Sequence, residues 1–103
     1  MIQEQMLCKE FAEKCHLVST PETRLMDTFS ELGELTKEVL KNSQYGSMPC
    51  TPSKEIADEM GDCLFSLLCL CNSLGIDAQE ALQNALRKYE TRYMTKGEIS
   101  SGK

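Results

Sequence analysis

Two short acidic motifs carry the chemistry that this 103-residue sequence suggests. Glu31 and Glu34 stand three residues apart, and Glu59 and Asp62 repeat that spacing further along the chain. Side chains three or four residues apart are neighbours on one face of a helix, so each motif would present a pair of carboxylates, and Glu38 continues the first face. Four converging carboxylates repel one another unless a cation lies among them. Magnesium is the natural candidate because it typically binds carboxylates together with water and phosphate.

Two antiparallel helices are needed to bring the motifs together. Apolar positions recur at helical spacing almost throughout, and no stretch alternates with period two for long enough to be a strand. The segment between the motifs can finish one helix, turn through a loop at Asn42–Pro52 that is rich in turn residues, and return. We therefore expect an all-α fold class, a four-helix-bundle-like chain that forms one domain over residues 1–103.

Cap and stop signals set the bounds of the expected helices. The second helix is capped by Thr20 or, alternatively, by Ser19. A polar tail is expected from about residue 95. The four helices are expected at about Ile2 to Leu17, from Pro21 to the loop, from the Thr51 and Pro52 signal to Leu74 and the terminator Gly75, and from the cap Asp77 to Met94. The residues expected to be buried in the first helix include Met6, Phe11 and Cys15. The apolar stripe expected on the second helix consists of Leu25, Phe29, Leu32, Leu35 and Val39.

Composition and charge exclude several classes of function. The formal net charge of -5 argues against a nucleic-acid-binding protein, because such proteins bind phosphates through clustered Lys and Arg. The six cysteines lack zinc-ligand spacing, and the first residues show no basic segment followed by an apolar one, so reduced thiols in a cytoplasmic protein are expected. The apolar run Cys63–Cys71 is far shorter than the roughly 20 residues that span a bilayer, so no membrane segment is expected.

That apolar run also predicts an assembly. The segment CLFSLLCLC is apolar on nearly every face, and a helix in a small four-helix monomer would expose at least one of those faces to water. We expect homo-oligomerisation to a dimer or tetramer that completes the core. A buried central helix within a monomer is the alternative.

The sequence around the two motifs resembles a known family. ELGE at residues 31–34 and EMGD at residues 59–62, with the flanking segments SELGELTKEV and EIADEMGDCLFSLLCL, are similar to the ExxE, spacer, ExxD signature of MazG-like all-α nucleotide pyrophosphohydrolases. The resemblance covers about Leu25 to Tyr93. It implies that Glu31, Glu34, Glu59 and Asp62 bind Mg2+ and form the catalytic site.

The resemblance also implies a substrate and a reaction. Members of this family hydrolyse (deoxy)nucleoside triphosphates to a monophosphate and pyrophosphate, which is a house-cleaning activity on the nucleotide pool. Basic residues on the last helix would contact the phosphates, so Lys88 and Arg92, with Asn84 as a weaker candidate, are expected to bind substrate. Aromatic and polar residues would recognise the base, and the available ones are His16, Phe11 and Tyr45.

Two alternatives remain open, and one residue departs from the family pattern. Many relatives carry a second acid directly before the first motif, where this chain has Ser30, and that leaves the number of magnesium ions undetermined. Phosphoribosyl-ATP pyrophosphohydrolase activity is a second enzymatic interpretation. A helical dimerisation or regulatory module that lacks turnover is the alternative from another class.

Overall fold

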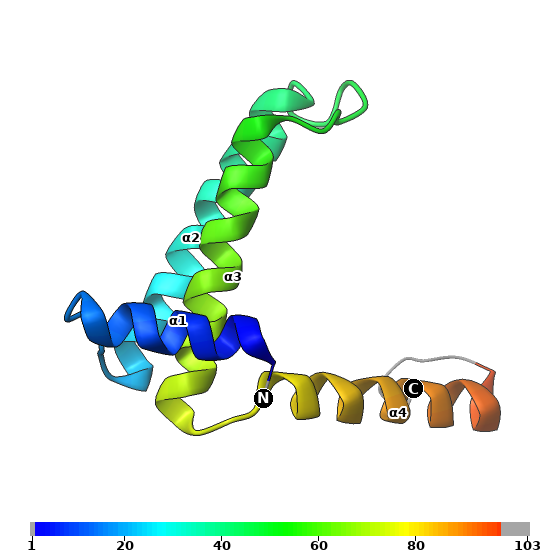
Figure 1. The fold of residues 1–103 in the computed structure, drawn as a ribbon. Helices are drawn as coiled ribbons and strands as arrows, with labels where there is room; N and C mark the ends of the chain where they lie inside the picture. Colours follow the sequence, from blue (N-terminus) through cyan, green and yellow to red (C-terminus); the bar gives the residue numbers. More distant parts are fainter. Residues whose placement is uncertain (1, 98–103) are drawn as a thin grey trace.

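A computed structural model describes residues 2–97 of the chain. It is built from four helices, and the residues described include no strand (Figure 1). Their bounds are Gln3–Lys14 for α1, Pro21–Asn42 for α2, Lys54–Leu74 for α3 and Ala78–Lys96 for α4. The all-α fold class predicted from the sequence is confirmed. Most of the predicted polar tail lies outside the described residues.

The first residues of α2 and α4 follow the cap signals in the sequence. Thr20 caps α2 by accepting a hydrogen bond from the Thr23 backbone N–H at 3.2 Å, and Pro21 occupies the first helical position. The Thr20 alternative is therefore confirmed over Ser19. The Asp77 carboxylate caps α4 by accepting from two backbone N–H groups, those of Gln79 and Glu80. Both helices begin where a side-chain oxygen satisfies donors that no backbone carbonyl can reach.

The predicted start of α3 was wrong by two residues. Ser53, rather than Thr51, caps α3 and accepts a hydrogen bond from the Ile56 backbone N–H at 3.1 Å. Thr51 is held elsewhere, because its backbone N–H donates to Asn42 Oδ1 at 2.8 Å. This contact holds the α2–α3 loop against the end of α2, and α3 therefore begins only after Pro52.

The helix ends agree with the sequence at one site and differ at two. Gly75 adopts the left-handed conformation with φ of 68° and ends α3, as predicted. By contrast, α1 ends at Lys14, three residues before the predicted Leu17, and His16 takes a positive φ of 59°. The last helix continues past Met94 to Lys96 and ends at Gly97.

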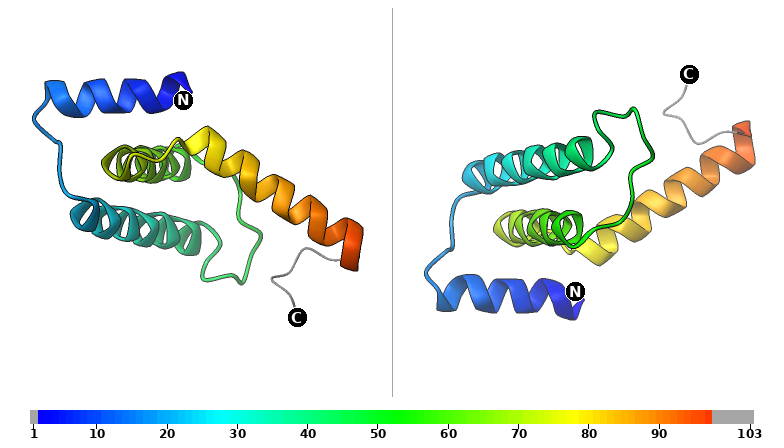
Figure 2. Two further views of the ribbon diagram at one scale, coloured as in Figure 1. Left: turned by 90° about the horizontal axis from the view of Figure 1, so that it is seen from below. Right: turned by 90° about the horizontal axis from the view of Figure 1, so that it is seen from above.

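The four helices are arranged around α3. Helices α2 and α3 run antiparallel side by side, and α1 crosses the C-terminal half of α3 (Figure 1). Seen along the α2–α3 pair, α3 lies between α1 and α2 (Figure 2). Helix α4 leaves the end of α3 at 99° and extends away from the other three helices (Figures 1 and 2). No single helix among the described residues is long and apolar enough to cross a membrane, although α3 and α4 meet the length and composition criteria as this bent pair.

The fully buried side chain of Gln5 fixes the joint between α3 and α4. Gln5 Nε2 donates to Asn72 Oδ1 at 2.9 Å and to the Ile76 carbonyl at 2.8 Å, and Gln5 Oε1 accepts from the Ala78 backbone N–H at 2.9 Å. Asn72 Nδ2 donates back to the Gln5 carbonyl. One side chain of α1 thus ties the last turn of α3 to the first residue of α4. We call this set of contacts the Gln5 clasp.

Few apolar side chains are buried within one chain. Among the described residues the buried hydrophobic ones are Ala12, Cys63 and Cys69. The prediction that Met6, Phe11 and Cys15 are buried was wrong, because all three are exposed. In the predicted apolar stripe of α2, the exposed residues are Leu25, Phe29 and Leu32, and the half-buried ones are Leu35 and Val39. The reason is geometric: α2 presents Arg24 and Thr28, not its apolar stripe, to the interior.

The overall dimensions agree with this thin core. The radius of gyration is 16.6 Å, whereas a compact domain of about 100 residues has ~13 Å. The central position of α3 is consistent with the alternative of a central helix buried within a monomer. The burial of α3 is only partial, however. Met60, Leu64 and Leu67 of α3 are 45–55% exposed. One side of the central helix therefore still faces outward.

Candidate metal centre

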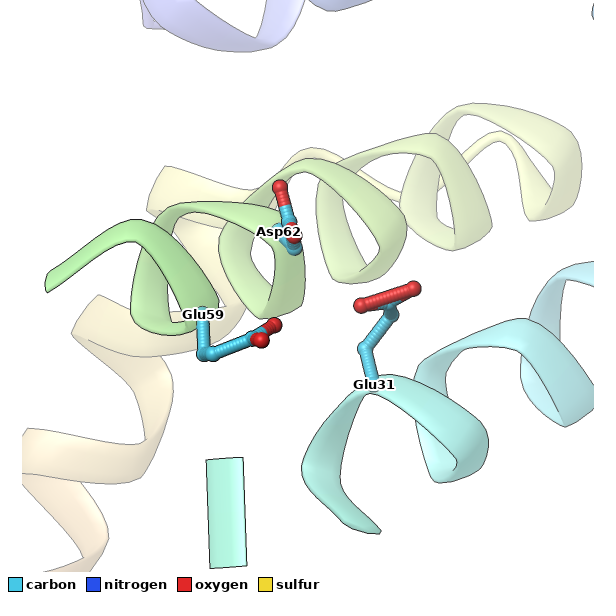
Figure 3. A group of neighbouring side chains, drawn as sticks. All are labelled: Glu31, Glu59 and Asp62. Carbon is cyan, nitrogen blue, oxygen red and sulfur yellow. The ribbon is translucent and has the colours of Figure 1, made fainter. Parts of the chain in front are cut away.

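Three of the four predicted carboxylates meet between α2 and α3. Oxygen atoms of Glu31, Glu59 and Asp62 lie within 4.8 Å of one another. Glu31 reaches from α2 towards α3, which carries the other two (Figure 3). The antiparallel pairing of the helices produces this meeting, as the spacer between the motifs predicts. Glu31 and Glu59 are half-buried, and Asp62 is exposed.

The remaining acids stand around this group. Glu34 is exposed and lies outside the set of converging oxygens, but its charge acts on Glu59. Loss of hydration raises the pKa of Glu59, and the negative charges of Asp62, Glu34, Glu31 and Glu38, in that order, raise this pKa further. The Lys41 ammonium lies 3.5 Å from Glu38 and pairs with that outlying acid. The charges of the neighbouring acids thus all act on Glu59. We call Glu31, Glu34, Glu59 and Asp62 the carboxylate site.

The donors fit magnesium in chemistry and in spacing. Carboxylate oxygens are the ligands that a hard divalent cation prefers, and oxygens around Mg2+ lie about 3.0–4.2 Å from one another at bonds of ~2.1 Å. Rotation of exposed or half-buried side chains from within 4.8 Å reaches that range. The raised pKa of Glu59 also indicates that a cation would relieve repulsion at this position. Glu31, Glu59 and Asp62 are therefore the residues that would hold the metal.

The two glycines inside the motifs, Gly33 and Gly61, lie in open surroundings. Their positions in helix interiors indicate a close approach of a neighbouring helix or of a ligand. Within this chain, however, a Cβ atom added to Gly33 or Gly61 would meet no atom within 4 Å. No helix of the same chain, over the residues described, thus requires glycine at either position. The face that carries both motifs is open.

The predicted phosphate-binding residues lie on a different part of the molecule. Lys88, Arg92 and Asn84 belong to α4, which points away from the α2–α3 pair (Figure 1). The Lys88 ammonium lies 5.2 Å from the ring centre of Tyr89, and Asn84 Oδ1 accepts a hydrogen bond from Arg87. The structure does not bring these side chains to the carboxylates of their own chain.

The residues proposed for base recognition are also dispersed. His16 follows α1, and Tyr45 follows α2 and is exposed. The length of α2, 22 residues or about 33 Å, separates the loops that hold them. Phe11 packs edge-on against Phe65 of α3 with ring centres 6.0 Å apart. These three side chains do not form one base pocket within a chain.

A small pocket lies beside α1 rather than at the carboxylates. It has a volume of about 90 Å³, and Arg24, Cys69 and Asn72 are among its lining residues. Binding sites for drug-sized ligands are typically about 300–1,000 Å³, so this pocket is too small for a nucleotide. The buried guanidinium of Arg24 instead binds the loop that follows α1 by donating to the Leu17 carbonyl, and it lies 5.9 Å from the ring centre of Phe65.

All six cysteines are unpaired, and the buried ones are poor nucleophiles. Burial raises the pKa of the Cys69 thiol, against the opposing effect of Arg24. Burial also raises the pKa of Cys63, and the neighbouring Glu31, Glu59 and Asp62 raise it further. A thiol with a raised pKa is protonated at neutral pH and reacts slowly. Neither of these two buried thiols is therefore a candidate catalytic nucleophile.

Comparisons with known proteins identify the family of the chain. Residues 19–95 match the family described as "MazG nucleotide pyrophosphohydrolase domain", a range that contains both acidic motifs and nearly all of α4. The chain is 45% identical over 65 residues to "Uncharacterized protein YpjD" of Bacillus subtilis (strain 168). That match covers 60% of this chain and 57% of the relative, so the chain spans little more than half of that protein. No solved structure matches significantly. The family match covers most of the sequence, and the chain belongs to the MazG nucleotide pyrophosphohydrolase domain family.

Proposed function

We propose that the protein hydrolyses (deoxy)nucleoside triphosphates to nucleoside monophosphate and pyrophosphate with magnesium, as a house-cleaning enzyme of the nucleotide pool. The observation that carries this proposal is the meeting of Glu31, Glu59 and Asp62 within 4.8 Å, in a member of a nucleotide pyrophosphohydrolase family. The net charge of the carboxylate site would repel a triphosphate, so a cation is required for the substrate to approach.

The residues of the site have separate tasks in this reaction. A bound magnesium ion would neutralise phosphate oxygens and lower the pKa of an attacking water molecule. Glu31, Glu59 and Asp62 would hold the cation from two helices, and Glu34, which lies outside the converging group, is free to accept a proton from that water.

The experiment that tests the proposal is magnesium-dependent pyrophosphate release from the eight common nucleoside triphosphates. The wild type is compared with Glu59→Gln and with Glu55→Gln, a matched control on the first turn of the same helix that lies outside the metal-binding group. We expect Glu59→Gln to reduce kcat/KM by about 100-fold or more, which corresponds to ~2.7 kcal/mol of transition-state stabilisation, and Glu55→Gln to retain activity. Equal release by the wild type and Glu59→Gln would refute the site, and no release by the wild type would refute the proposed substrates.

We also propose that the functional form is a homodimer or a homotetramer. The support is the outward-facing apolar surface of α2, where Leu25, Met26 and Phe29 are 56–78% exposed. Monomeric soluble proteins rarely expose a contiguous apolar surface of this kind. A second copy of the chain would cover the surface, and sedimentation of the purified protein measures whether it does. A single monomeric species at micromolar concentration would refute this proposal.

A further inference from the structure

We propose that Cys8 of α1 and Cys69 of α3 form a redox-active pair, in which Cys8 reacts with a small-molecule disulfide such as glutathione disulfide and Cys69 then closes a link between the two helices. The product is an intrachain disulfide that ties α1 covalently to α3. This inference is independent of the proposed hydrolysis. Three observations carry it: the face that α1 presents to α3, the contacts on either side of the two cysteines, and the small side chains between the helices.

The first observation is that α1 turns one narrow face to the rest of the chain. Within this helix, the residues that are not exposed are Gln5, Cys8 and Ala12. Their spacing of three and four residues places them on a single helix face. Helix α1 packs against α3, so Cys8 is the middle residue of the packed face and is half-buried there.

The second observation is that contacts on both sides of Cys8 determine which part of α3 it faces. Three residues before Cys8, Gln5 Nε2 donates to Asn72 Oδ1 at 2.9 Å. Three residues after Cys8, the ring of Phe11 packs edge-on against Phe65 with ring centres 6.0 Å apart. Cys8 therefore faces the part of α3 that lies between Phe65 and Asn72, where α1 crosses this helix (Figure 1).

Cys69 occupies the matching position on α3. It lies four residues after Phe65 and three before Asn72, and that spacing puts all three on one helix face. Its side chain is buried, and it lines the small pocket beside α1 together with Ala12 of that helix. The two cysteines thus face each other at the crossing of α1 and α3.

The third observation is that the buried side chains near this crossing are small. Ala12 of α1 and Ser66 and Cys69 of α3 are all buried. The axes of packed helices lie about 8–10 Å apart, and each Cα atom lies ~2.3 Å from its axis, so two opposed Cα atoms are roughly 3.4–5.4 Å apart. Disulfides join Cα atoms that are about 4.4–6.8 Å apart. The two ranges overlap, so a disulfide fits between closely packed helices.

The unequal exposure of the two thiols sets the order of the reaction. Cys8 is half-buried and Cys69 is buried, so the Cys8 thiolate attacks glutathione disulfide first, forms a mixed disulfide and releases one glutathione thiolate. The Cys69 thiolate then attacks Cys8 Sγ, which breaks the mixed disulfide and releases the second glutathione. Two protein thiols are oxidised, and one glutathione disulfide is reduced to two glutathione molecules that take up the two thiol protons.

Burial slows both steps without preventing them. Burial raises the pKa of the Cys69 thiol, Arg24 lowers it, and charge on Cys8 raises it further, so Cys69 reacts poorly with solutes. Its attack on Cys8 is intramolecular, however, and such steps proceed at effective concentrations far above those of a dissolved reagent. Burial and the Glu4 carboxylate also raise the pKa of Cys8, so exchange is faster at about pH 8.5 than at neutral pH.

Peptide mapping after oxidation tests the inference. The purified protein is incubated with excess glutathione disulfide at about pH 8.5 and is digested without reductant. We expect the wild type to give a peptide pair joined from Cys8 to Cys69 within one chain. Cys71→Ser, two positions further along α3 and therefore on another side of the helix, should give the same pair. A wild type that keeps glutathione on Cys8, fails to react there, or joins Cys8 to Cys71 or to another chain would overturn the inference.

The melting temperature of the linked protein supplies a second measurement. The link closes a loop of about 60 residues, and this restriction of the unfolded chain should raise the Tm of a domain of this size by about 10 °C or more. Dithiothreitol should reverse the rise. Cys8→Ser should show no rise, and it also controls for glutathione on the exposed Cys15 and Cys50. A linked wild type that melts at or below the temperature of the reduced protein would overturn the inference, because the disulfide would then not fit the folded structure.

Discussion

The Gln5 clasp yields a stability prediction whose size follows from its contacts. Gln5→Ala removes the donor to Asn72 Oδ1 and the Ile76 carbonyl and the acceptor of the Ala78 N–H. Each hydrogen bond contributes about 1 kcal/mol net, and a group left buried without a partner costs about 1–3 kcal/mol. We therefore expect the free energy of unfolding to fall by about 3 kcal/mol, measured by urea denaturation.

The control is Gln3→Ala, which changes the same residue type in the same helix at an exposed position. Exposed substitutions of this kind usually change stability by less than about 0.5 kcal/mol. Both variants are compared with the wild type at one protein concentration, because an oligomer would make stability concentration-dependent. Hydrogen exchange at the Ala78 amide supplies a local readout and should accelerate in Gln5→Ala alone. If the two variants unfolded within 0.5 kcal/mol of each other, the clasp would not hold α4.

Three further predictions test other contacts. Burial and the neighbouring acids raise the pKa of Glu59, so the folded state is more stable with this carboxyl protonated than with it ionised. The stability that the protonated carboxyl contributes is fully present below the unfolded pKa of ~4.3 and is lost as pH rises through the raised pKa of the folded state. Metal-free Glu59→Gln should therefore melt at a higher temperature than the wild type at pH 7, with no difference at pH 3, and a lower melting temperature at pH 7 would contradict this. Arg24→Ala should cost about 2 kcal/mol in urea denaturation, since the Leu17 carbonyl loses its charged donor; a neutral result would show that water replaces it. Gly75→Ala should destabilise by about 1–2 kcal/mol because φ is 68°, whereas Gly33→Ala, in an unobstructed helix interior, should stabilise an isolated chain by up to ~1 kcal/mol. Equal changes in stability from Gly75→Ala and Gly33→Ala would refute the conclusion that Gly75 is required for its positive φ and Gly33 is not.

Features set by local sequence could be predicted, and those set by distant contacts could not. Thr20 caps α2 and Gly75 ends α3 because each residue satisfies or permits backbone geometry within a few positions of itself. The start of α3 was displaced because the Thr51 N–H is bound by Asn42 across the loop. The direction of α4 depends on Gln5, which lies 73 positions before Ala78. A glutamine near the first turn of a helix carries no signal for such a role.

The carboxylate site was predictable for a similar physical reason. Identical three-residue spacing and an antiparallel return are enough to bring Glu31, Glu59 and Asp62 together, since both follow from helix geometry. Lys88 and Arg92 were predicted to bind phosphate from their residue type, but the sequence could not predict where they lie. Lys88 and Arg92 lie on a helix whose direction is decided at the α3–α4 joint, beyond the range of any local pattern.

The apolar stripes show why burial was predicted less well than helicity. A period of 3.6 residues identifies the face of α2 that carries Leu25, Phe29 and Leu32, but it cannot say whether the same chain or another copy covers that face. Within one chain, α2 instead buries Arg24 and Thr28, whose polar atoms bind the carbonyls of Leu17 and Arg24. These hydrogen bonds satisfy the polar atoms that α2 buries. The larger apolar side chains of α2 face outward. The interior of α2 is thus specified by polar contacts, and its apolar stripe is available to stabilise an assembly.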